Sequence, residues 1–349
     1  MRIYWSLYPL ALMYGLAVHL RNKCFDWGIL KQNRYTLPII CIGNLTVGGT
    51  GKTPHTEYLI RLLSRQGKVA VLSRGYKRQT QGFVLADAHT SMPDIGDEPY
   101  QMKQKFPDIT VAVDANRREG IEKLMPLHPD VILLDDAYQH RYVKAGLNLL
   151  LTDYNRLMTR DHMLPAGRLR EPLCGKRRAD ILIVTKCPAT IPAIECDAIR
   201  KELKPLPHQQ VFFSAFEYGL LQSIFQAQES CSVTDIQPHD QVLLLTGIAN
   251  PEPLRQHLQK RTENIIPLEF PDHYTFSKKD LLNICTAYHA LPQSGKRWII
   301  TTEKDATRLS ALQDIDAEVA RNIWALPIEV KILEGKEQEF NNRICKELK

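Results

Sequence analysis

A glycine-rich loop between an apolar run and a helical segment constrains this chain more than any other feature. Residues 43–54 read Gly-Asn-Leu-Thr-Val-Gly-Gly-Thr-Gly-Lys-Thr-Pro, and the apolar run 37–42 precedes them. A strand, a glycine loop and a helix in this order form a cradle whose backbone N–H groups bind phosphate oxygens. A lysine in such a loop reaches the outer phosphates, and a following Ser or Thr hydroxyl ligates Mg²⁺. The loop therefore predicts a nucleoside triphosphate site.

The loop departs from the usual phosphate-binding pattern at one position, because its first glycine would fall at Thr46. A glycine-rich turn with an incidental lysine is the alternative interpretation. We expect nucleotide contacts from the eight residues that follow, which are Val47, Gly48, Gly49, Thr50, Gly51, Lys52, Thr53 and Pro54.

A second apolar run, 131–134, ends in the acidic pair Asp135 and Asp136. A buried strand that ends in acidic residues downstream of a phosphate loop places a carboxylate near the Mg²⁺ ion. Two aspartates that merely begin a polar loop after a strand would give the same sequence pattern. Residues 139–141, Gln-His-Arg, follow directly, at the place where a substrate group would approach.

The fold class follows from strand-length apolar runs that alternate with helical stretches. Such alternation predicts an α/β fold, with a parallel sheet covered by helices on both faces and ligands at the carboxyl ends of the strands. The predicted strands are 39–42, 69–72, 109–113, 131–134, 147–151 and 181–184.

The pattern changes after Pro205. Residues 211–225 predict two strands and a turn, as in a hairpin that connects two domains. A second, smaller α/β lobe follows, with strands expected at 242–247, 298–302 and 328–333. The expected domains are an N-terminal helix at 1–25, a phosphate-loop core at 26–210, a strand linker at 211–230 and the second lobe at 231–349.

The N-terminus is apolar, with no Asp, Glu, Lys or Arg from Ile3 to Leu20. Such a stretch lies at the lower edge of what spans a membrane. Pro9 is suited to the first position of a helix, and a helix from there to Asn22 would be about 21 Å long. This length is less than the ~30 Å hydrocarbon core.

One stripe of this helix carries Ala11, Gly15 and His19, opposite a surface of Leu, Met and Tyr. The arrangement favours a helix that lies on or dips into one leaflet of a membrane. A buried core helix and a signal peptide are the alternatives, although only Arg2 provides the positive lead of a signal peptide.

Composition narrows the class of protein. Charged residues make up 24% and hydrophobic residues 44% of the 349-residue chain, as in a globular protein. The net charge of +6 suits an acidic partner such as a phosphorylated lipid or an anionic membrane surface. The pattern of basic and aromatic residues does not suggest nucleic acid. Eight cysteines without a C-x-x-C pair predict no zinc site and a reducing cytoplasm.

Three further segments are weaker signals when taken alone. Residues 73–76, Ser-Arg-Gly-Tyr, follow a predicted strand, and residues 96–99, Gly-Asp-Glu-Pro, place two carboxylates in an expected loop. Residues 164–172 open a basic patch that continues to 176–178. Each of these segments is also compatible with a solvated loop.

Together these segments resemble the tetraacyldisaccharide 4'-kinases of lipid A (lipopolysaccharide) biosynthesis. The resemblance covers most of the chain, and its elements are 43–44, 47–54, 73–76, 96–99, 135–141, 164–172, 270–274 and 302–305. It implies a kinase at the cytoplasmic face of the bacterial inner membrane. The acceptor would be the 4'-hydroxyl of a lipid A disaccharide 1-phosphate, the co-substrate ATP with Mg²⁺, and the product lipid IVA. No protein partner is implied.

The resemblance also implies residue roles. Lys52 would contact the β- and γ-phosphates, and Asp97 would be the catalytic base, paired with His273 from the second lobe. The magnesium environment would be Thr53, Asp135, Asp136 and Glu171. The acceptor and its phosphate would lie near Arg74, Tyr76, Arg117, Gln139, His140 and Arg170. The sequence leaves Arg117 and Arg118 as alternatives for one of these positions.

Two other classes of nucleotide-binding protein compete with this interpretation. The loop also resembles that of partition and nitrogenase-iron ATPases, which act as switches and carry a signature lysine where this chain has Val47. A GTPase would require an Asn-Lys-x-Asp segment, of which residues 185–187, Thr-Lys-Cys, are at best a fragment. Both differences favour the kinase.

Overall fold

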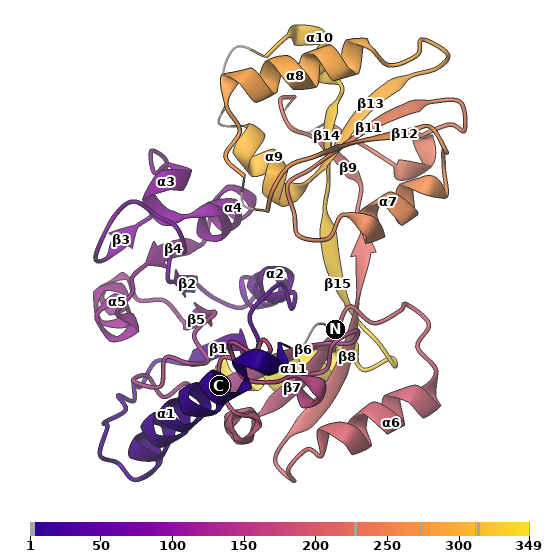
Figure 1. Ribbon diagram of the computed structural model, residues 1–349. Coiled ribbons are helices and arrows are strands. Elements are labelled where there is room, and N and C mark those ends of the chain that lie inside the picture. Colours follow the sequence, from indigo (N-terminus) through magenta and orange to yellow (C-terminus); the bar gives the residue numbers. More distant parts are fainter. Residues whose placement is uncertain (1–3, 227–228, 273, 311, 313–314, 349) are drawn as a thin grey trace. The chain divides into compact units, whose positions relative to one another are not determined.

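The chain folds into two compact units. The computed structural model describes residues 4–226, 229–272, 274–310, 312 and 315–348. Unit 1 contains the chain up to Phe216 and again from Val330 onward, and unit 2 contains Glu217–Glu329 (Figure 1). From the sequence we expected the C-terminal segment in the second lobe. The structure places it in unit 1, because Phe340 and Ile344 are buried in the core of the first sheet.

Unit 1 is built on a nine-stranded sheet in the order β15-β8-β7-β6-β1-β5-β2-β4-β3. Neighbouring strands from β8 to β4 run parallel, and β3 pairs antiparallel to β4. The six predicted strands and the α/β class are confirmed. The strands are β1 (Ile39–Asn44), β2 (Val69–Ser73), β3 (Val84–Leu85), β4 (Thr110–Val113), β5 (Val131–Asp135), β6 (Leu147–Asp153), β7 (Ile181–Thr185), β8 (Gln210–Tyr218) and β15 (Ile328–Ile332).

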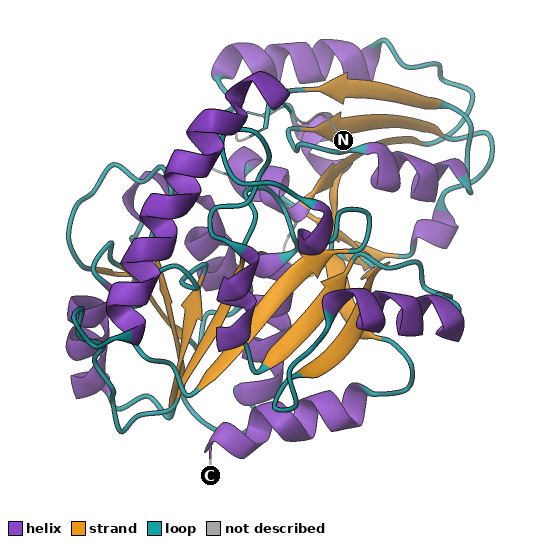
Figure 2. Ribbon diagram, turned by 60° about the horizontal axis from the view of Figure 1, so that its bottom comes forward, coloured by secondary structure: helices purple, strands orange, loops and turns teal. Residues whose placement is uncertain are grey.

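Helices cover both faces of this sheet (Figure 2). Alternate residues of each strand contribute to two separate cores, as the two-residue period of a strand requires. One core contains side chains of α2 (Lys52–Leu63), α3 (Met92–Ile95), α4 (Asp97–Lys105) and α11 (Glu337–Cys345). The other contains side chains of α5 (Arg117–Leu124) and α6 (Ala193–Leu203).

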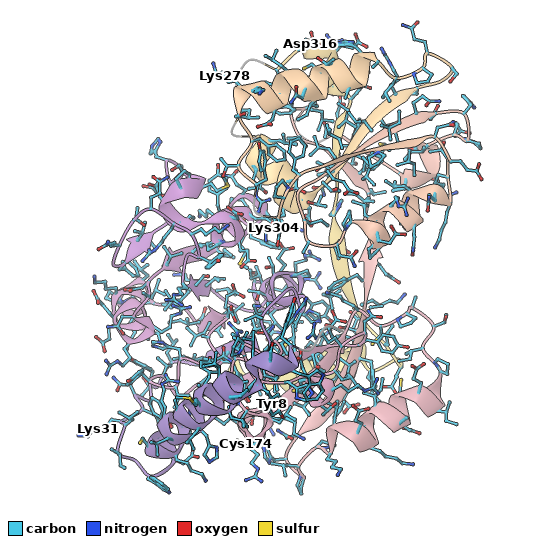
Figure 3. All side chains as sticks on the ribbon, in the orientation of Figure 1. Tyr8, Lys31, Cys174, Lys278, Lys304 and Asp316 are labelled. Carbon is cyan, nitrogen blue, oxygen red and sulfur yellow. The ribbon has the colours of Figure 1, made fainter. Side chains whose placement is uncertain are left out.

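The N-terminal helix α1 (Tyr8–Asp26) packs against unit 1 along the predicted stripe. Ala11 is buried, a Cβ on Gly15 would lie 3.4 Å from Met163 Cγ, and His19 Nδ1 lies 3.8 Å from Cys174 Sγ. Tyr8, in the first turn, and Cys174 are labelled in Figure 3.

The helix is longer than we predicted. It has 19 residues, which corresponds to about 28 Å at 1.5 Å per residue. Pro9 is its second residue, one position later than predicted and still in the first turn. Among the helices of the described residues, none combines the length and the hydropathy that a membrane span requires.

Unit 2 contains a six-stranded sheet in the order β10-β9-β14-β13-β11-β12. Strands were predicted at the positions of β11 and β13, but β12 and β14 were not predicted. The strands are β9 (Leu221–Ser223), β10 (Ser230–Cys231), β11 (Gln241–Thr246), β12 (Ile265–Glu269), β13 (Arg297–Thr302) and β14 (Ile323–Leu326). The helices are α7 (Glu252–Gln259), α8 (Lys278–His289), α9 (Glu303–Leu309) and α10 (Ala317–Arg321).

The predicted hairpin in the linker is wrong. Strand β8 belongs to the first sheet, where it pairs with β7, whereas β9 belongs to the second sheet, where it pairs with β14 and β10. Two adjacent strands with a turn between them look alike in sequence whether they pair with each other or with other strands.

The Thr302–Asp305 motif has a structural role within unit 2. Asp305 is fully buried, and its Oδ2 accepts hydrogen bonds from Gly247 N at 2.9 Å and from the Thr302 hydroxyl at 2.8 Å. Arg308 Nη1 neutralises the same carboxylate at 2.9 Å. The motif therefore caps α9 and joins the carboxyl ends of β11 and β13.

We predict that Gly120→Ala destabilises unit 1, because a Cβ at this position of α5 would lie 2.8 Å from Leu72 Cδ2 and 3.2 Å from Asp114 Cβ. Overpacking of this kind costs about 1–3 kcal/mol, more than the ~1 kcal/mol of helix propensity that alanine adds. Thermal unfolding of the full chain measures the effect. Gly15→Ala is the control, since its Cβ would make only an ordinary contact. An equal melting temperature for both variants would contradict the prediction.

Candidate active site

The phosphate loop joins β1 to α2 and adopts backbone angles that require glycine at two positions. Gly48 has a φ of +106° and Gly51 a φ of +86°, a region that other residues rarely adopt. A Cβ on Gly51 would also lie 2.7 Å from Phe216 Cζ. Gly51 caps α2, whose first residue is Lys52. The loop thus leads directly into the amino-terminal end of a helix, where anions bind favourably.

Asp136 links the loop to a second segment of the chain. Its Oδ2 lies 3.8 Å from Lys52 Nζ, and its Oδ1 accepts a hydrogen bond from Arg170 Nη2 at 2.8 Å. Burial would raise the pKa of Asp136, but Lys52 and Arg170 together hold it below its ordinary value. The structure therefore brings the phosphate-loop lysine and the Asp136 carboxylate together.

Asp135 lies in a different environment from its neighbour. It is buried, and its Oδ1 accepts a hydrogen bond from the Thr56 hydroxyl at 3.0 Å. Among the described residues, no hydrogen-bond partner reaches its Oδ2. Desolvation, together with the charges of Glu98 and Asp136, raises the pKa of Asp135 to about 7. The end of β5 therefore carries negative charge that its surroundings only partly neutralise.

The segment 164–172 runs beside the phosphate loop. Val47 N donates to Arg168 O at 2.8 Å, and Arg170 N donates to Leu45 O at 2.7 Å. These backbone bonds place the Arg170 side chain on Asp136. Glu171, in contrast, is buried and forms an ion pair with Arg178, and it also accepts a hydrogen bond from Asn22 at 2.9 Å. Since these contacts use its carboxylate, we do not assign Glu171 to magnesium.

Arg117 and Arg118 differ in their surroundings. Arg117 is buried and donates from Nη1 to Asp114 O at 2.6 Å. Desolvation lowers its pKa to about 10, although the charges of Asp135 and Asp136 act in the opposite direction. Arg118 lies over the ring of Tyr142, 5.1 Å from its centroid. Of the two alternatives, Arg117 is therefore the residue within electrostatic reach of the acidic pair.

His140 lies among several arginines. Desolvation first, and then the charges of Arg117, Arg21, Arg118 and Arg74, lower its pKa from 6.5 to about 4. The imidazole is therefore neutral at physiological pH, and the arginines give the region a positive potential. Such a potential favours an anionic ligand.

Gln139 and Tyr76 occupy different parts of the region. Gln139 donates from Nε2 to Asn44 O at 2.8 Å, and its own backbone oxygen accepts from Arg21 Nη2 at 3.3 Å. The Tyr76 side chain is exposed. Its backbone carbonyl would lie 2.7 Å from a Cβ on Gly96, so residues 73–76 and Gly96 are in close contact.

Asp97 is the first residue of α4, not part of a loop as we expected. Gly96, with a φ of +88°, allows α3 to end and α4 to begin within one residue. Asp97 and Glu98 lie in the first turn, where the helix dipole favours acidic groups. His273, predicted as the partner of Asp97, lies outside the described residues.

Two site residues have contacts that sequence reasoning did not identify. Asn44 is fully buried; its Nδ2 donates to the Thr50 hydroxyl at 2.7 Å and its Oδ1 accepts from Arg170. Arg21, which the sequence analysis did not single out, donates to the Gln139 carbonyl. The Gly43-Asn44 pair in the sequence pointed to Asn44, but nothing in the sequence pattern indicated Arg21.

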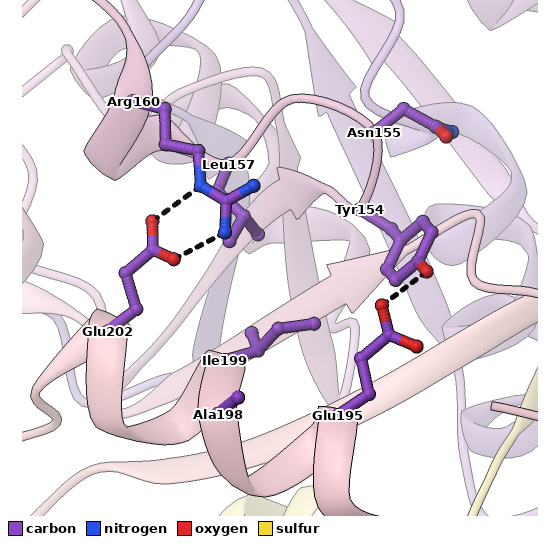
Figure 4. A pocket seen from close by; sticks show the side chains of 8 residues that line it. All are labelled: Tyr154, Asn155, Leu157, Arg160, Glu195, Ala198, Ile199 and Glu202. Carbon is purple, nitrogen blue, oxygen red and sulfur yellow. Dashed lines mark hydrogen bonds and ion pairs between the residues drawn. The ribbon is translucent and has the colours of Figure 1, made fainter. Parts of the chain in front are cut away.

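A cavity of about 330 Å³ lies between α6 and the segment that follows β6. Inside it, the Arg160 side chain pairs with Glu202, and the Tyr154 hydroxyl donates to Glu195 at 2.6 Å (Figure 4). None of its lining residues is a predicted site residue, and both carboxylates are used in these pairs. The cavity therefore adds nothing to the site at the phosphate loop.

The parallel sheet, the loop between β1 and α2 and the acidic pair at the end of β5 define a P-loop nucleotide-binding protein of the kinase type. Residues 3–349 match the sequence profile of the family described as "Tetraacyldisaccharide-1-P 4'-kinase". The chain belongs to this family, and the resemblance drawn from its motifs is confirmed.

Individual relatives agree with this assignment. The chain is 52% identical over 349 residues to the tetraacyldisaccharide 4'-kinase of Bacteroides fragilis, covering 98% of this chain and 93% of that protein. It is 52% identical over 342 residues to the enzyme of the same name from Phocaeicola vulgatus, covering 97% and 93%. A crystal structure of LpxK from Aquifex aeolicus, described as an "apo" form in complex with ATP, has a TM-score of 0.75 and 30% identity and covers 99% of each chain.

We predict that His140 makes the protein less stable in acid. Its folded-state pKa of about 4 lies below the ordinary 6.5, so the unfolded chain binds a proton that the folded chain does not. The contribution of His140 to the free energy of unfolding should therefore fall as the pH decreases from 6.5 towards 4, whereas Asp135, with its pKa raised to about 7, contributes in the opposite direction. Thermal unfolding across this range should show a shallower decline for His140→Gln. Part of the decline should persist, because burial also lowers the pKa of His55 to about 4. If the stability of the variant and of wild type declined equally with pH, His140 would not be a source of the acid sensitivity.

Proposed function

We propose that this protein transfers the γ-phosphate of ATP to the 4'-hydroxyl of a tetraacyldisaccharide 1-phosphate, giving lipid IVA in lipid A biosynthesis. The observation that carries the proposal is the convergence on Asp136 of Lys52 from the phosphate loop and Arg170 from segment 164–172. Membership of the kinase family supplies the reaction, and the ATP complex of the Aquifex aeolicus relative supports the nucleotide.

The acidic pair fits a divalent cation. The buried Asp135 Oδ2 without a described partner, and the raised pKa of Asp135, indicate a place where added positive charge would be favourable. In the described part of the chain, no three His, Cys, Asp or Glu side chains gather into a metal site of their own. Mg²⁺ in kinases needs only one or two carboxylates, because phosphate oxygens and water complete its coordination.

We assign Asp135, Asp136 and the Thr53 hydroxyl to magnesium. When bound, Mg²⁺ would neutralise negative charge on the outer phosphates of ATP as it develops during transfer. Lys52 would supply a second positive charge to the same phosphates from the first position of α2. The loop residues 47–54 would hold the triphosphate through their backbone.

Asp97 is the proposed base that takes the proton of the sugar hydroxyl, with His273 as its partner. Its position supports this role: α4 begins at Asp97, and Gly96 is in contact with the loop 73–76 that follows β2. Glu98, the next residue, is close enough to Asp135 to raise its pKa. The first turn of α4 therefore lies beside the proposed magnesium residues.

The acceptor and its phosphate are assigned to the positive region around His140. Arg74, Arg117 and Arg170 would provide charge, and Tyr76, Gln139 and the neutral His140 would provide hydrogen bonds. An ATPase switch of the partition or nitrogenase-iron type would not require this region. It would also use a lysine at the position of Val47, whose backbone here pairs with Arg168.

We also propose that α1 attaches the protein to the cytoplasmic face of the inner membrane. The helix exposes a group of large apolar side chains on the side opposite Ala11, Gly15 and His19. They are Leu10, Leu12, Met13, Leu16 and Leu20, and the exposed Trp5 and Trp27 flank them. Tryptophan at both ends of an exposed apolar helix suits the interfacial layer of a bilayer. The other proposed partners are ATP and the lipid acceptor, without nucleic acid or another protein.

The decisive experiment measures transfer of labelled γ-phosphate from ATP to a lipid A disaccharide 1-phosphate, with the full-length protein in detergent. We expect a labelled, doubly phosphorylated lipid, and no such product without acceptor or with Lys52→Ala. If ATP were hydrolysed without acceptor and no labelled lipid formed, the proposal of a kinase would give way to that of an ATPase switch.

We predict that Asp97→Asn lowers kcat about 10²–10⁴-fold, the usual contribution of a general base, and leaves ATP affinity largely intact. Steady-state transfer assays with an ATP-binding measurement separate the two effects. Asp197→Asn is the matched control, since this aspartate lies on α6 and pairs with Arg200. Near wild-type turnover of Asp97→Asn would remove Asp97 from the mechanism.

We predict that the double substitution Leu12→Glu and Leu16→Glu weakens binding to anionic phospholipid vesicles at least about tenfold. Each leucine that enters the apolar phase contributes about 1.5–3 kcal/mol, and a carboxylate adds repulsion from anionic lipid. Sedimentation with vesicles measures the effect. Leu282→Glu, on the equally exposed Leu282 of α8, should bind like wild type. Unchanged sedimentation of the double variant would exclude α1 as the attachment site.

A further inference from the structure

Three consecutive carbonyl groups of the phosphate loop are held by side chains from outside the loop. The Gly49 carbonyl accepts a hydrogen bond from the Lys186 ammonium, and the Thr50 carbonyl accepts one from the Thr185 hydroxyl at 2.8 Å. The Gly51 carbonyl lies 2.7 Å from Nδ1 of His55, which donates when its proton is on that nitrogen. None of the three side chains is among the residues assigned to nucleotide, metal or acceptor.

Each of these side chains is itself fixed by a second contact. Lys186 Nζ pairs with Asp153 Oδ2 at 2.7 Å. The Thr185 hydroxyl lies at the end of β7 and is also 3.3 Å from the Thr152 carbonyl. His55 is buried, and its Nε2 lies 2.9 Å from the hydroxyl of Ser214, a fully buried residue of β8. The loop that follows β1 is thereby anchored to β6, β7 and β8.

The anchors determine the direction of backbone N–H groups. In a planar trans peptide the carbonyl and the following N–H point in opposite directions. Holding the oxygens of residues 49–51 therefore orients the N–H groups of Thr50, Gly51 and Lys52 to the other side. Thr50 N is used within the loop, 3.0 Å from Gly48 O. The N–H groups of Gly51 and Lys52, at the amino-terminal end of α2, consequently lie on the side opposite the anchors, where they can donate to an anion.

We propose that Thr185, Lys186 and His55 are positioning residues that preorganise the phosphate loop for the triphosphate, an inference that rests on the ATP-binding part of the proposed function. A loop with glycine at 48, 49 and 51 has much conformational freedom to lose on binding. Side chains that restrict it beforehand raise affinity without touching the ligand. The competing explanation is that these groups only stabilise the fold.

Thr185→Val tests the inference, because it keeps the branched shape of the side chain and removes only the hydroxyl. We expect the ATP dissociation constant of the full-length protein, measured without acceptor, to rise about fivefold or more, the usual effect of one hydrogen bond. The KM for the lipid acceptor should not change. Thr185→Ser, which restores the donor, should return the dissociation constant to within about twofold of wild type.

Thr262→Val is the matched control for lost stability. Thr262 is also a buried threonine, and its hydroxyl donates to the Asp240 carbonyl at 3.0 Å within unit 2. Thr262→Val should lower the melting temperature as Thr185→Val does but leave ATP affinity at the wild-type value. Lys186→Met provides a second test if Thr185→Val fails to fold, because 35% of the Lys186 side chain is exposed. Lys186→Met should also weaken ATP binding in ~0.5 M salt. At this concentration the long-range charge of Lys186 is screened, so its loss does not account for the effect.

Three results would overturn the inference. ATP affinity could be unchanged in both Thr185→Val and Lys186→Met, Thr262→Val could weaken ATP binding as much as Thr185→Val does, or Thr185→Ser could fail to restore it. If the wild-type protein bound no ATP, the proposed function would fail together with the inference. If wild type bound ATP and all variants matched it, only the inference would fail.

Discussion

Two adjacent carboxylates at the end of a fully buried strand are the constraint on which the site depends. Burying Asp135 is costly, and the neighbouring half-buried Asp136 adds charge repulsion. Their direct contacts are unequal: Asp136 pairs with Lys52 and Arg170, whereas Asp135 accepts a hydrogen bond from the Thr56 hydroxyl and feels the charges of Lys52 and Arg117 only at longer range. The phosphate loop and segment 164–172 are therefore tied to one carboxylate, and the other is the one with an unused buried oxygen that we propose for the cation.

Helix α1 connects the apolar surface with this charged region. On its packed side, Tyr14 donates to Arg170 O at 3.0 Å, Arg21 to Gln139 O at 3.3 Å and Asn22 to Glu171 at 2.9 Å. On its other side it exposes leucine and methionine. A lipid with a phosphorylated headgroup has the same division into apolar and anionic parts, so one helix can serve both the proposed membrane attachment and the proposed acceptor site.

Six strands of the first sheet could be predicted because they are buried on both faces and appear as continuous apolar runs, whereas the two-residue β3 was not predicted and β15 was expected in the second lobe. The same rule explains one omission, because β12 contains Pro267 and is half-exposed; β14 is buried and was missed although it is as long as β4. Which sheet a strand joins depends on contacts between distant residues. For this reason β8 and β9 were misread as a hairpin, and α11 was not placed beside α2.

The site could be predicted at the level of the sheet edge, but not at the level of individual contacts. The carboxyl ends of parallel strands meet at one edge, so the motifs after β1, β2 and β5 had to lie close together. Motif spacing carries no information about which side chain satisfies which partner, and so Glu171 could not be assigned to Arg178 in advance. The same holds for the loop itself. Its glycines permit the required backbone angles but do not select them, and the selection comes from Thr185 and Lys186, whose positions more than a hundred residues away give no local signal.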